Sequence, residues 1–100
     1  ADEELKHLAE NYDVSVGKGA VVNNSIIMPG SVIEDGAVVE YSIIAENVTV
    51  KSGAHVGASP KSGEDKKITV VGNSICIGKD SVVNAGAIIE QDVPEGEAAL

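Results

Sequence analysis

The sequence predicts an all-β fold in which the chain winds into about four stacked, triangular coils. The first observation is the composition. Of 100 residues, 43% are hydrophobic, yet only 2% are aromatic, and there is no Phe and no Trp. The apolar content is therefore nearly all Val, Ile and Ala. A core of small, β-branched side chains is typical of many copies of one narrow site, because an irregular globular core uses bulky aromatics to fill its centre.

The second observation is a repeat. Residues 17–33, "GKGAVVNNSIIMPGSVI", are followed by residues 34–50, "EDGAVVEYSIIAENVTV", which repeat them at a shift of 17 residues. Within the repeat a Val or Ile recurs every five or six residues, and a small residue stands two positions before most of them. That offset places both side chains on one face of a strand. We expect an inner core ladder of Val16, Val22, Ile27, Ile33, Val39, Ile44, Val50, Val56, Val71, Ile77, Val83 and Ile89.

The third observation concerns the bends between these short strands. Three residues after many ladder positions stands a residue type that tolerates a positive φ. Three strands and three bends close one coil, and successive coils stack as parallel strands. Rules for parallel crossovers favour a right-handed path, and the rhythm alone does not overturn them. The expected bends are Gly19, Gly30, Gly36, Gly53, Gly86, Asn47 and Asp80.

The rhythm also divides the chain. We expect the solenoid over residues 14–94, with a loop inserted at 57–67, "GASPKSGEDKK", because Val56 and Val71 lie 15 residues apart where 5 are expected. Residues 1–13 lack the pattern and are expected to form a cap or linker, with a short helix over residues 2–12. Residues 95–100 are expected to form a C-terminal tail.

The net charge and the distribution of apolar residues limit the partners and the cellular location that we expect for this protein. The net charge is −9, with seven Lys and no Arg, which argues against binding to nucleic acid or to an anionic membrane surface. No apolar run approaches the ~20 residues of a membrane span. The single cysteine, Cys76, has no partner for an internal disulfide, which fits a reducing compartment. We expect a soluble, cytoplasmic protein.

The six-residue pattern aliphatic–Gly/Asp/Glu–x–Gly–Ala/Ser–x, which recurs along the chain, resembles the hexapeptide-repeat family, whose members fold as left-handed parallel β-helices. The residues "VGKGAVVNNSIIMPGSVIEDGAVVEYSIIAENVTVKSGAHVG" and "KKITVVGNSICIGKDSVVNAGAII" are similar to the C-terminal domain of bacterial glucose-1-phosphate adenylyltransferase. The similarity covers roughly residues 14–90, and "NSIIMPGSVI" and "KITVVG" are its most specific segments. The resemblance implies the left-handed path that the rhythm alone does not.

The resemblance also implies a role. In that family the β-helix is a tail that contributes to tetramer assembly and to regulation by metabolites. A separate N-terminal nucleotidyltransferase domain uses Mg²⁺ and ATP to convert glucose 1-phosphate into ADP-glucose and pyrophosphate for glycogen synthesis. This chain has no glycine cluster that follows a strand and opens a helix, and no Arg to clamp a phosphoryl group.

We therefore expect a non-catalytic assembly and regulatory domain with no cofactor of its own. The parent protein is expected to be the enzyme. The expected partners are further copies of the chain or an N-terminal catalytic domain, together with a small anionic metabolite as effector.

The alternative is a small, complete acyltransferase that uses acetyl-CoA and places its sites between neighbouring β-helices. His55 precedes ladder residue Val56, so its side chain is expected to point outward, where a histidine can act as a base at neutral pH. The other interpretation is a solvated side chain, since the aligned residues Val21 and Val38 have no chemistry. His7 lies outside the repeat and is a weaker candidate.

Two further features are candidate sites. Lys61, Lys66 and Lys67 lie in the inserted loop and are candidate contacts for a phosphate or an acyl carrier. Their alternative interpretation is a solvated loop balanced by nearby carboxylates. Cys76 has no base nearby to activate it, and the scattered His and Cys residues show no metal-ligand spacing.

Aliphatic residues beside the ladder are the last feature. They are expected to point outward, where a monomeric solenoid would carry polar side chains. Such rows indicate burial against another subunit or domain, although β-propensity alone also enriches them. They are Val21, Ile26, Val32, Val38, Ile43 and Val82.

Overall fold

A computed structural model describes residues 14–99, all of which are strand, turn or loop. Thirteen short strands form three parallel sheets. Sheet A has the order β1-β4-β7-β10, sheet B the order β13-β11-β8-β5-β2, and sheet C the order β12-β9-β6-β3. The strands are β1 (Ser15–Val16), β2 (Val21–Asn23), β3 (Ile26–Ile27), β4 (Val32–Ile33), β5 (Val38–Glu40), β6 (Ser42–Ile44), β7 (Thr49–Val50), β8 (His55–Val56), β9 (Thr69–Val71), β10 (Cys76–Ile77), β11 (Val82–Val83), β12 (Ile88–Ile89) and β13 (Ala98–Ala99).

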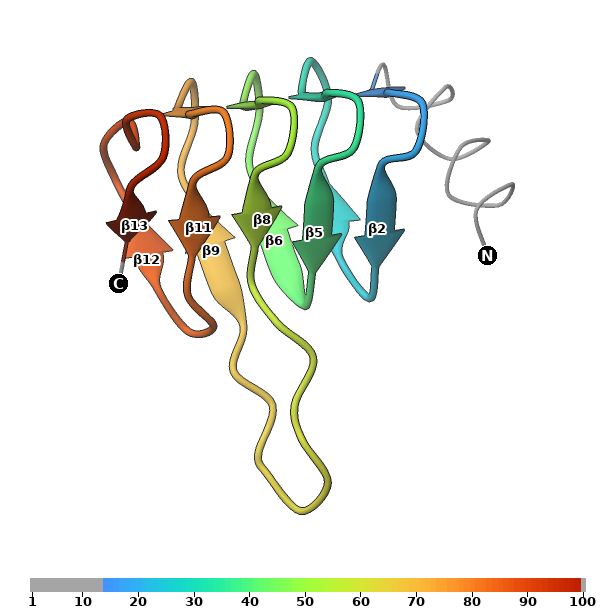
Figure 1. Ribbon diagram of the computed structural model, residues 1–100, viewed down its shortest axis with the longest axis vertical. Coiled ribbons are helices and arrows are strands. Elements are labelled where there is room, and N and C mark those ends of the chain that lie inside the picture. The colour runs from blue at the N-terminus through green and yellow to red at the C-terminus, as the bar shows by residue number, and fades with distance from the viewer. Residues whose placement is uncertain (1–13, 100) are drawn as a thin grey trace.

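Each coil takes one strand from each sheet, so the molecule is a triangular prism with sheets A, B and C as its faces (Figure 1). Seen from the N-terminal end, the chain turns counter-clockwise as it recedes. It is a left-handed parallel β-helix, which confirms the predicted all-β fold and the handedness that the resemblance implied. The helix expected over residues 2–12 lies outside the described residues.

The register follows the repeat. Val21 of β2 lies opposite Val38 of β5, and Val38 lies opposite His55 of β8, each pair 17 residues apart. Where the inserted loop intervenes the separation rises to 27, as for His55 and Val82. The loop therefore adds ten residues without disturbing the stacking of the coils on either side.

Ladder side chains fill the interior. Ten of the twelve are buried, and from Ile33 to Ile77 every one has no exposed surface. Val16 and Ile27, in the first coil, are partly buried against this core. Close packing of Val and Ile side chains along each ridge explains why the core contains no aromatic residue.

The small inner side chains form hydrogen bonds with backbone N–H and C=O groups near the corners. Ser31 Oγ donates to the carbonyl of Ala45 at 2.7 Å and accepts from the N–H of Val48 at 3.0 Å. Thr69 Oγ1 likewise donates to the carbonyl of Asn84 and accepts from the N–H of Gly86, each at 3.1 Å. Buried hydroxyls thus replace ladder hydrogen bonds that the bends interrupt.

Bends occur where the sequence placed them, since Gly19, Gly30, Gly36, Asn47, Gly53, Asp80 and Gly86 all have positive φ. Further bends use residues that the pattern did not single out. The positive φ of Asn24, Tyr41 and Ser74 was not expected. Glycine is thus common at these corners but not required.

The C-terminal boundary needs correction. Residues 95–100 were expected to be a tail, yet β13 pairs in parallel with β11, and Val93 bridges Ile77. A fifth coil therefore begins after β12. It was missed because Ala98 and Ala99 occupy positions at which the earlier coils carry Val or His.

Candidate functional site

The three outer faces of the prism differ in chemistry, and each is defined by the residue before and the residue after each inner ladder position. On sheet A these outward residues include Thr49, Cys76, Glu34 and Lys51. Lys51 Nζ lies 3.7 Å from Glu34 Oε2. A groove of about 470 Å³ beside them is also lined by Cys76. Both charge signs meet in it, so sheet A is a polar face with no preference for one ligand charge.

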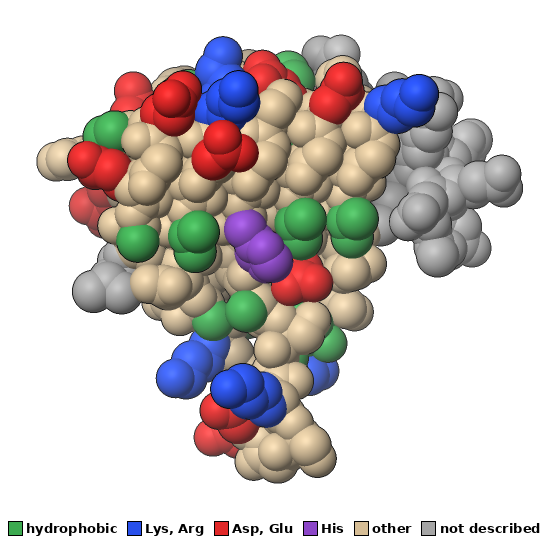
Figure 2. All heavy atoms as spheres, viewed as in Figure 1, with side chains coloured by type: hydrophobic (Ala, Val, Ile, Leu, Met, Phe, Trp, Pro, Cys, Tyr) green, Lys and Arg blue, Asp and Glu red, His purple; other side chains and the backbone are tan. Residues whose placement is uncertain are grey.

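Sheet B carries the candidate base. His55 points outward in register between Val38 and Val82, and Figure 2 shows this face with hydrophobic side chains on both sides of the histidine. Its Nε2 lies 3.4 Å from Glu40 Oε2, with the two side chains 45% and 20% exposed. The sequence did not predict this carboxylate. Glu40 follows inner residue Val39 on the adjacent strand, so the register of β5 and β8 creates the pair.

A histidine beside a carboxylate is the arrangement in which a base is oriented by a third group. In the described part of the chain, the register neighbours of His55 on sheet B are the aliphatic Val38 and Val82. Neither the groove on sheet A nor the hollow beside β12 and β13 includes His55. The pair therefore provides a base and its orienting group, and it lies outside both of these hollows.

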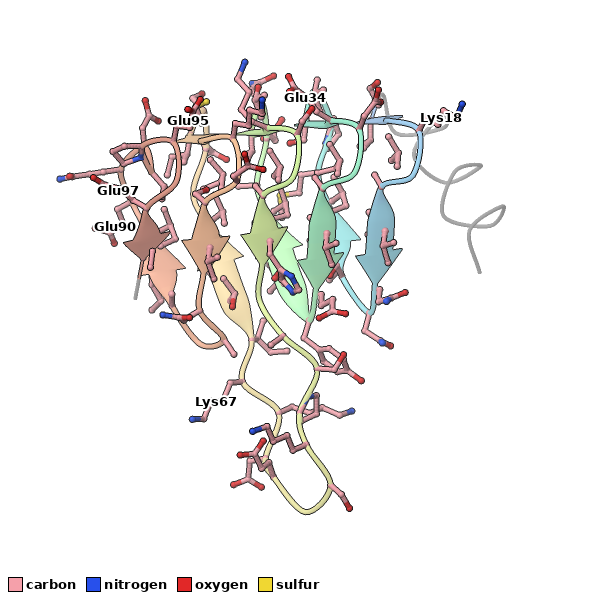
Figure 3. All side chains as sticks on the ribbon, in the orientation of Figure 1. Lys18, Glu34, Lys67, Glu90, Glu95 and Glu97 are labelled. Carbon is pink, nitrogen blue, oxygen red and sulfur yellow. The ribbon has the colours of Figure 1, made fainter. Side chains whose placement is uncertain are left out.

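The inserted loop leaves the corner between sheets B and C and projects away from the prism (Figure 1). Its tip is a tight turn in which the N–H of Lys61 donates to Glu64 Oε1 and the N–H of Glu64 donates to the carbonyl of Lys61, both at 2.9 Å. Lys61, Lys66 and Lys67 are all exposed. Figure 3 shows Lys67 near the base of the loop. The loop does not gather the three lysines with His55 in either described pocket.

Sheet C is the apolar face. Its outward row runs Ile26, Ile43, Val70, Ile88 in register across all four strands. Ile26 is 60% exposed and Ile88 is 67% exposed. Met28 on the same face and Ile68 at the loop's return to it are exposed too, so four of the five exposed large hydrophobic side chains among residues 14–99 gather here. Sequence reasoning singled out Ile26 and Ile43 but missed the others, because it did not assign outward residues to separate faces.

Other site types have little support in the described part of the chain. No group of three or more His, Cys, Asp or Glu residues there is arranged to hold a metal ion. A second hollow of about 340 Å³ lies at the C-terminal end, beside β12 and β13. Within residues 14–99, no helix is long and apolar enough to cross a membrane.

Comparison with known proteins gives the family. The model of the family described as "GMPPB C-terminal domain" matches residues 9–94. The chain belongs to this family. The GMPPB C-terminal domain is a left-handed β-helix of sugar nucleotidyltransferases, which agrees with the fold and with the nucleotidyltransferase tail that the resemblance implied. No curated protein matches the chain in sequence.

Two solved structures are similar to this chain over part of their length. The acetyltransferase domain of PglB from Neisseria gonorrhoeae in complex with acetyl coenzyme A is 19% identical, with a TM-score of 0.33. The match covers 86% of this chain and 50% of that one. A second structure of that domain is 17% identical, with a TM-score of 0.33 and coverage of 96% and 60%. The chain thus spans little more than half the length of the structures it matches.

Proposed function

We propose that this domain is a non-catalytic assembly and regulatory tail of a sugar nucleotidyltransferase. The observation that carries the proposal is the apolar face of sheet C. Four exposed aliphatic or thioether side chains gather on this face and at its loop edge, and such a gathered apolar patch supports a surface that another protein covers. Membership of the GMPPB C-terminal domain family supports a nucleotidyltransferase as the protein that carries the domain.

The finer proposal is that the parent enzyme is a glucose-1-phosphate adenylyltransferase. Its reaction converts ATP and glucose 1-phosphate into ADP-glucose and pyrophosphate. The support is the similarity of "NSIIMPGSVI" and "KITVVG" to that enzyme's tail. The regulatory part is a prediction that a small anionic metabolite acts through the tail, with the loop lysines as candidate contacts.

The test of this role is turnover by the purified chain. With ATP, glucose 1-phosphate and Mg²⁺ supplied, we expect no pyrophosphate release above a protein-free blank, because the chain has neither a phosphate-binding loop nor an arginine. Turnover that scales with the amount of chain, and that survives a further purification step, would overturn the non-catalytic role.

Acetyl transfer from acetyl-CoA is a second candidate, favoured by the His55–Glu40 pair. If His55 is the base, His55→Ala removes the activity and Glu40→Gln lowers it, since the amide cannot stabilise an imidazolium as a carboxylate does. Lys51→Ala, on another face, serves as the control. Acetyl transfer that His55→Ala leaves intact would remove this candidate.

A further inference from the structure

We propose that sheet C is the surface on which a second copy of this chain docks, in a two-fold dimer whose solenoid axes run parallel. Each inserted loop then reaches the acidic edge of the partner's sheet C. The inference rests on the proposed assembly function and deepens it, because it names the face, the occupant and the arrangement.

The charge distribution favours a second copy as the occupant. Two chains that each carry −9 repel one another, so they associate most readily through a neutral face. The outward residues of sheet C are Ile26, Met28, Ile43, Ala45, Val70, Gly72, Ile88 and Glu90, and only the last is charged. Sheet A carries Glu34 and Lys51 outward. Sheet B is also largely neutral, but its one carboxylate, Glu40, lies beside His55 within the sheet, whereas the one charge of sheet C, Glu90, follows its last strand, β12.

The area of sheet C is too small for the two sheets alone to form a specific dimer interface. Four strands spaced ~4.8 Å apart and about five residues wide present roughly 300 Å² per copy. Two such faces bury roughly 600 Å², whereas a specific interface needs about 1,000 Å² in total. The loop beside this face is the element that supplies the remainder, since it projects beyond the corner of the prism (Figure 1).

The loop and the opposite edge of sheet C have complementary charges. Six lysines lie in the described residues, and three of them, Lys61, Lys66 and Lys67, are on the loop at the corner of sheets B and C, where they outnumber the loop's two carboxylates, Glu64 and Asp65. The other corner of sheet C, where the chain passes to sheet A, contains Glu46, Glu90 and Asp92, all exposed, and no lysine. Figure 3 shows Glu90 at the C-terminal end and Lys67 at the base of the loop.

These charges select one of two symmetric arrangements. A two-fold axis along the strands would bring both loops to one side, where two loops of net charge +1 repel each other. A two-fold axis parallel to the solenoid axis exchanges the two edges of sheet C, so each basic loop meets the partner's acidic edge. Attraction between opposite charges favours the second arrangement.

The first experiment measures the mass of the 100-residue chain in solution by sedimentation, over a dilution series. We expect a reversible dimer. Ile26→Lys combined with Ile88→Lys should weaken it at least about tenfold, because it buries charge in the contact. The control is Val82→Lys, compared with Ile88→Lys alone: each introduces one positive charge at an exposed side chain, and Val82 is 44% exposed on sheet B. The control should change the dissociation constant less than about twofold. Circular dichroism checks that all variants are folded.

The second experiment tests the arrangement with two variants. In the loop variant, Lys66→Glu and Lys67→Glu reverse the sign of two loop charges. In the edge variant, Glu46→Lys and Glu90→Lys reverse the sign of two charges at the acidic edge. Each variant alone should dimerise more weakly than the parent, and an equimolar mixture should form a mixed dimer. Net charge alone predicts a different result, because the edge variant loses two carboxylates and gains two lysines, which changes its net charge from −9 to −5, and it should then dimerise more tightly than the parent.

A chain that stays monomeric throughout, or a dimer that tolerates the Ile26→Lys/Ile88→Lys change, would overturn the inference. A mixture with no mixed dimer would overturn the parallel arrangement. These outcomes are separate from a failure of the proposed function, which would be seen as nucleotidyl transfer by the chain.

Discussion

Replacing Ile33 by Ala tests the central structural feature, an interior filled by one small side chain per strand. Ile33 has no exposed surface and lies between Val16 and Val50 along one inner ridge. Truncating a buried Ile to Ala costs about 2–5 kcal/mol, of which part is the cavity that remains. For a chain of this length the whole free energy of unfolding is of the order of 5–15 kcal/mol, so the variant should lose a large share of it.

The neighbouring residue supplies the control. Val32 precedes Ile33 on β4 but points out of the prism and is only partly buried. Val32→Ala should cost about 1 kcal/mol or less, which is the span of β-propensity on a strand surface. Ile33→Val should fall between the two, at about 0.5–1.5 kcal/mol.

Urea denaturation followed by circular dichroism measures these differences. The comparison requires similar slopes for all variants, because a changed slope indicates a loss of cooperativity along the solenoid. If Val32→Ala were as destabilising as Ile33→Ala, or if Ile33→Ala cost less than about 1 kcal/mol, the assignment of inner and outer faces would be refuted.

Three further predictions concern the corners and the loop. Gly57 has φ of +75°, and a Cβ added there would overlap a backbone carbonyl of the neighbouring coil. Gly63 has a similar φ of +83°, but a Cβ added there meets nothing within 4 Å. Gly57→Ala should therefore lower the melting temperature more than Gly63→Ala does, which thermal unfolding measures. Ser31→Ala should cost about 1–3 kcal/mol in urea denaturation, because the N–H of Val48 loses its buried acceptor; equal stability of parent and variant would contradict this. Replacing residues 58–66 by a short glycine linker should change the unfolding free energy by less than about 1 kcal/mol, since loop closure depends weakly on length, yet should weaken self-association; collapse of the fold would show that the loop is structural.

Much of the fold follows from the sequence because each coil of a solenoid repeats the same residue pattern and the same local structure. The recurrence of Val and Ile identified the inner ladder, and the broken interval between Val56 and Val71 located the inserted loop. The start of the fifth coil escaped because Ala98 and Ala99 are too small to extend the aliphatic pattern. Handedness came only from family resemblance, since crossover physics favours the opposite path.

The surfaces were less predictable than the core. Outward aliphatic residues were recognised one at a time, but their gathering on sheet C depends on which strand each belongs to and on the register across the loop. Val70 and Ile88 join Ile26 and Ile43 only through that register. The His55–Glu40 contact arises in the same way, from side chains 15 residues apart that adjacent coils bring together.

The most direct test of the account is the native mass of the nucleotidyltransferase proposed to carry this domain, measured with and without residues 14–99, together with its turnover per catalytic site. We predict that removing the domain lowers the mass of the assembly while the catalytic domain keeps substantial turnover. An assembly of unchanged subunit number, or turnover abolished in a folded catalytic domain, would contradict a domain that assembles subunits and performs no chemistry.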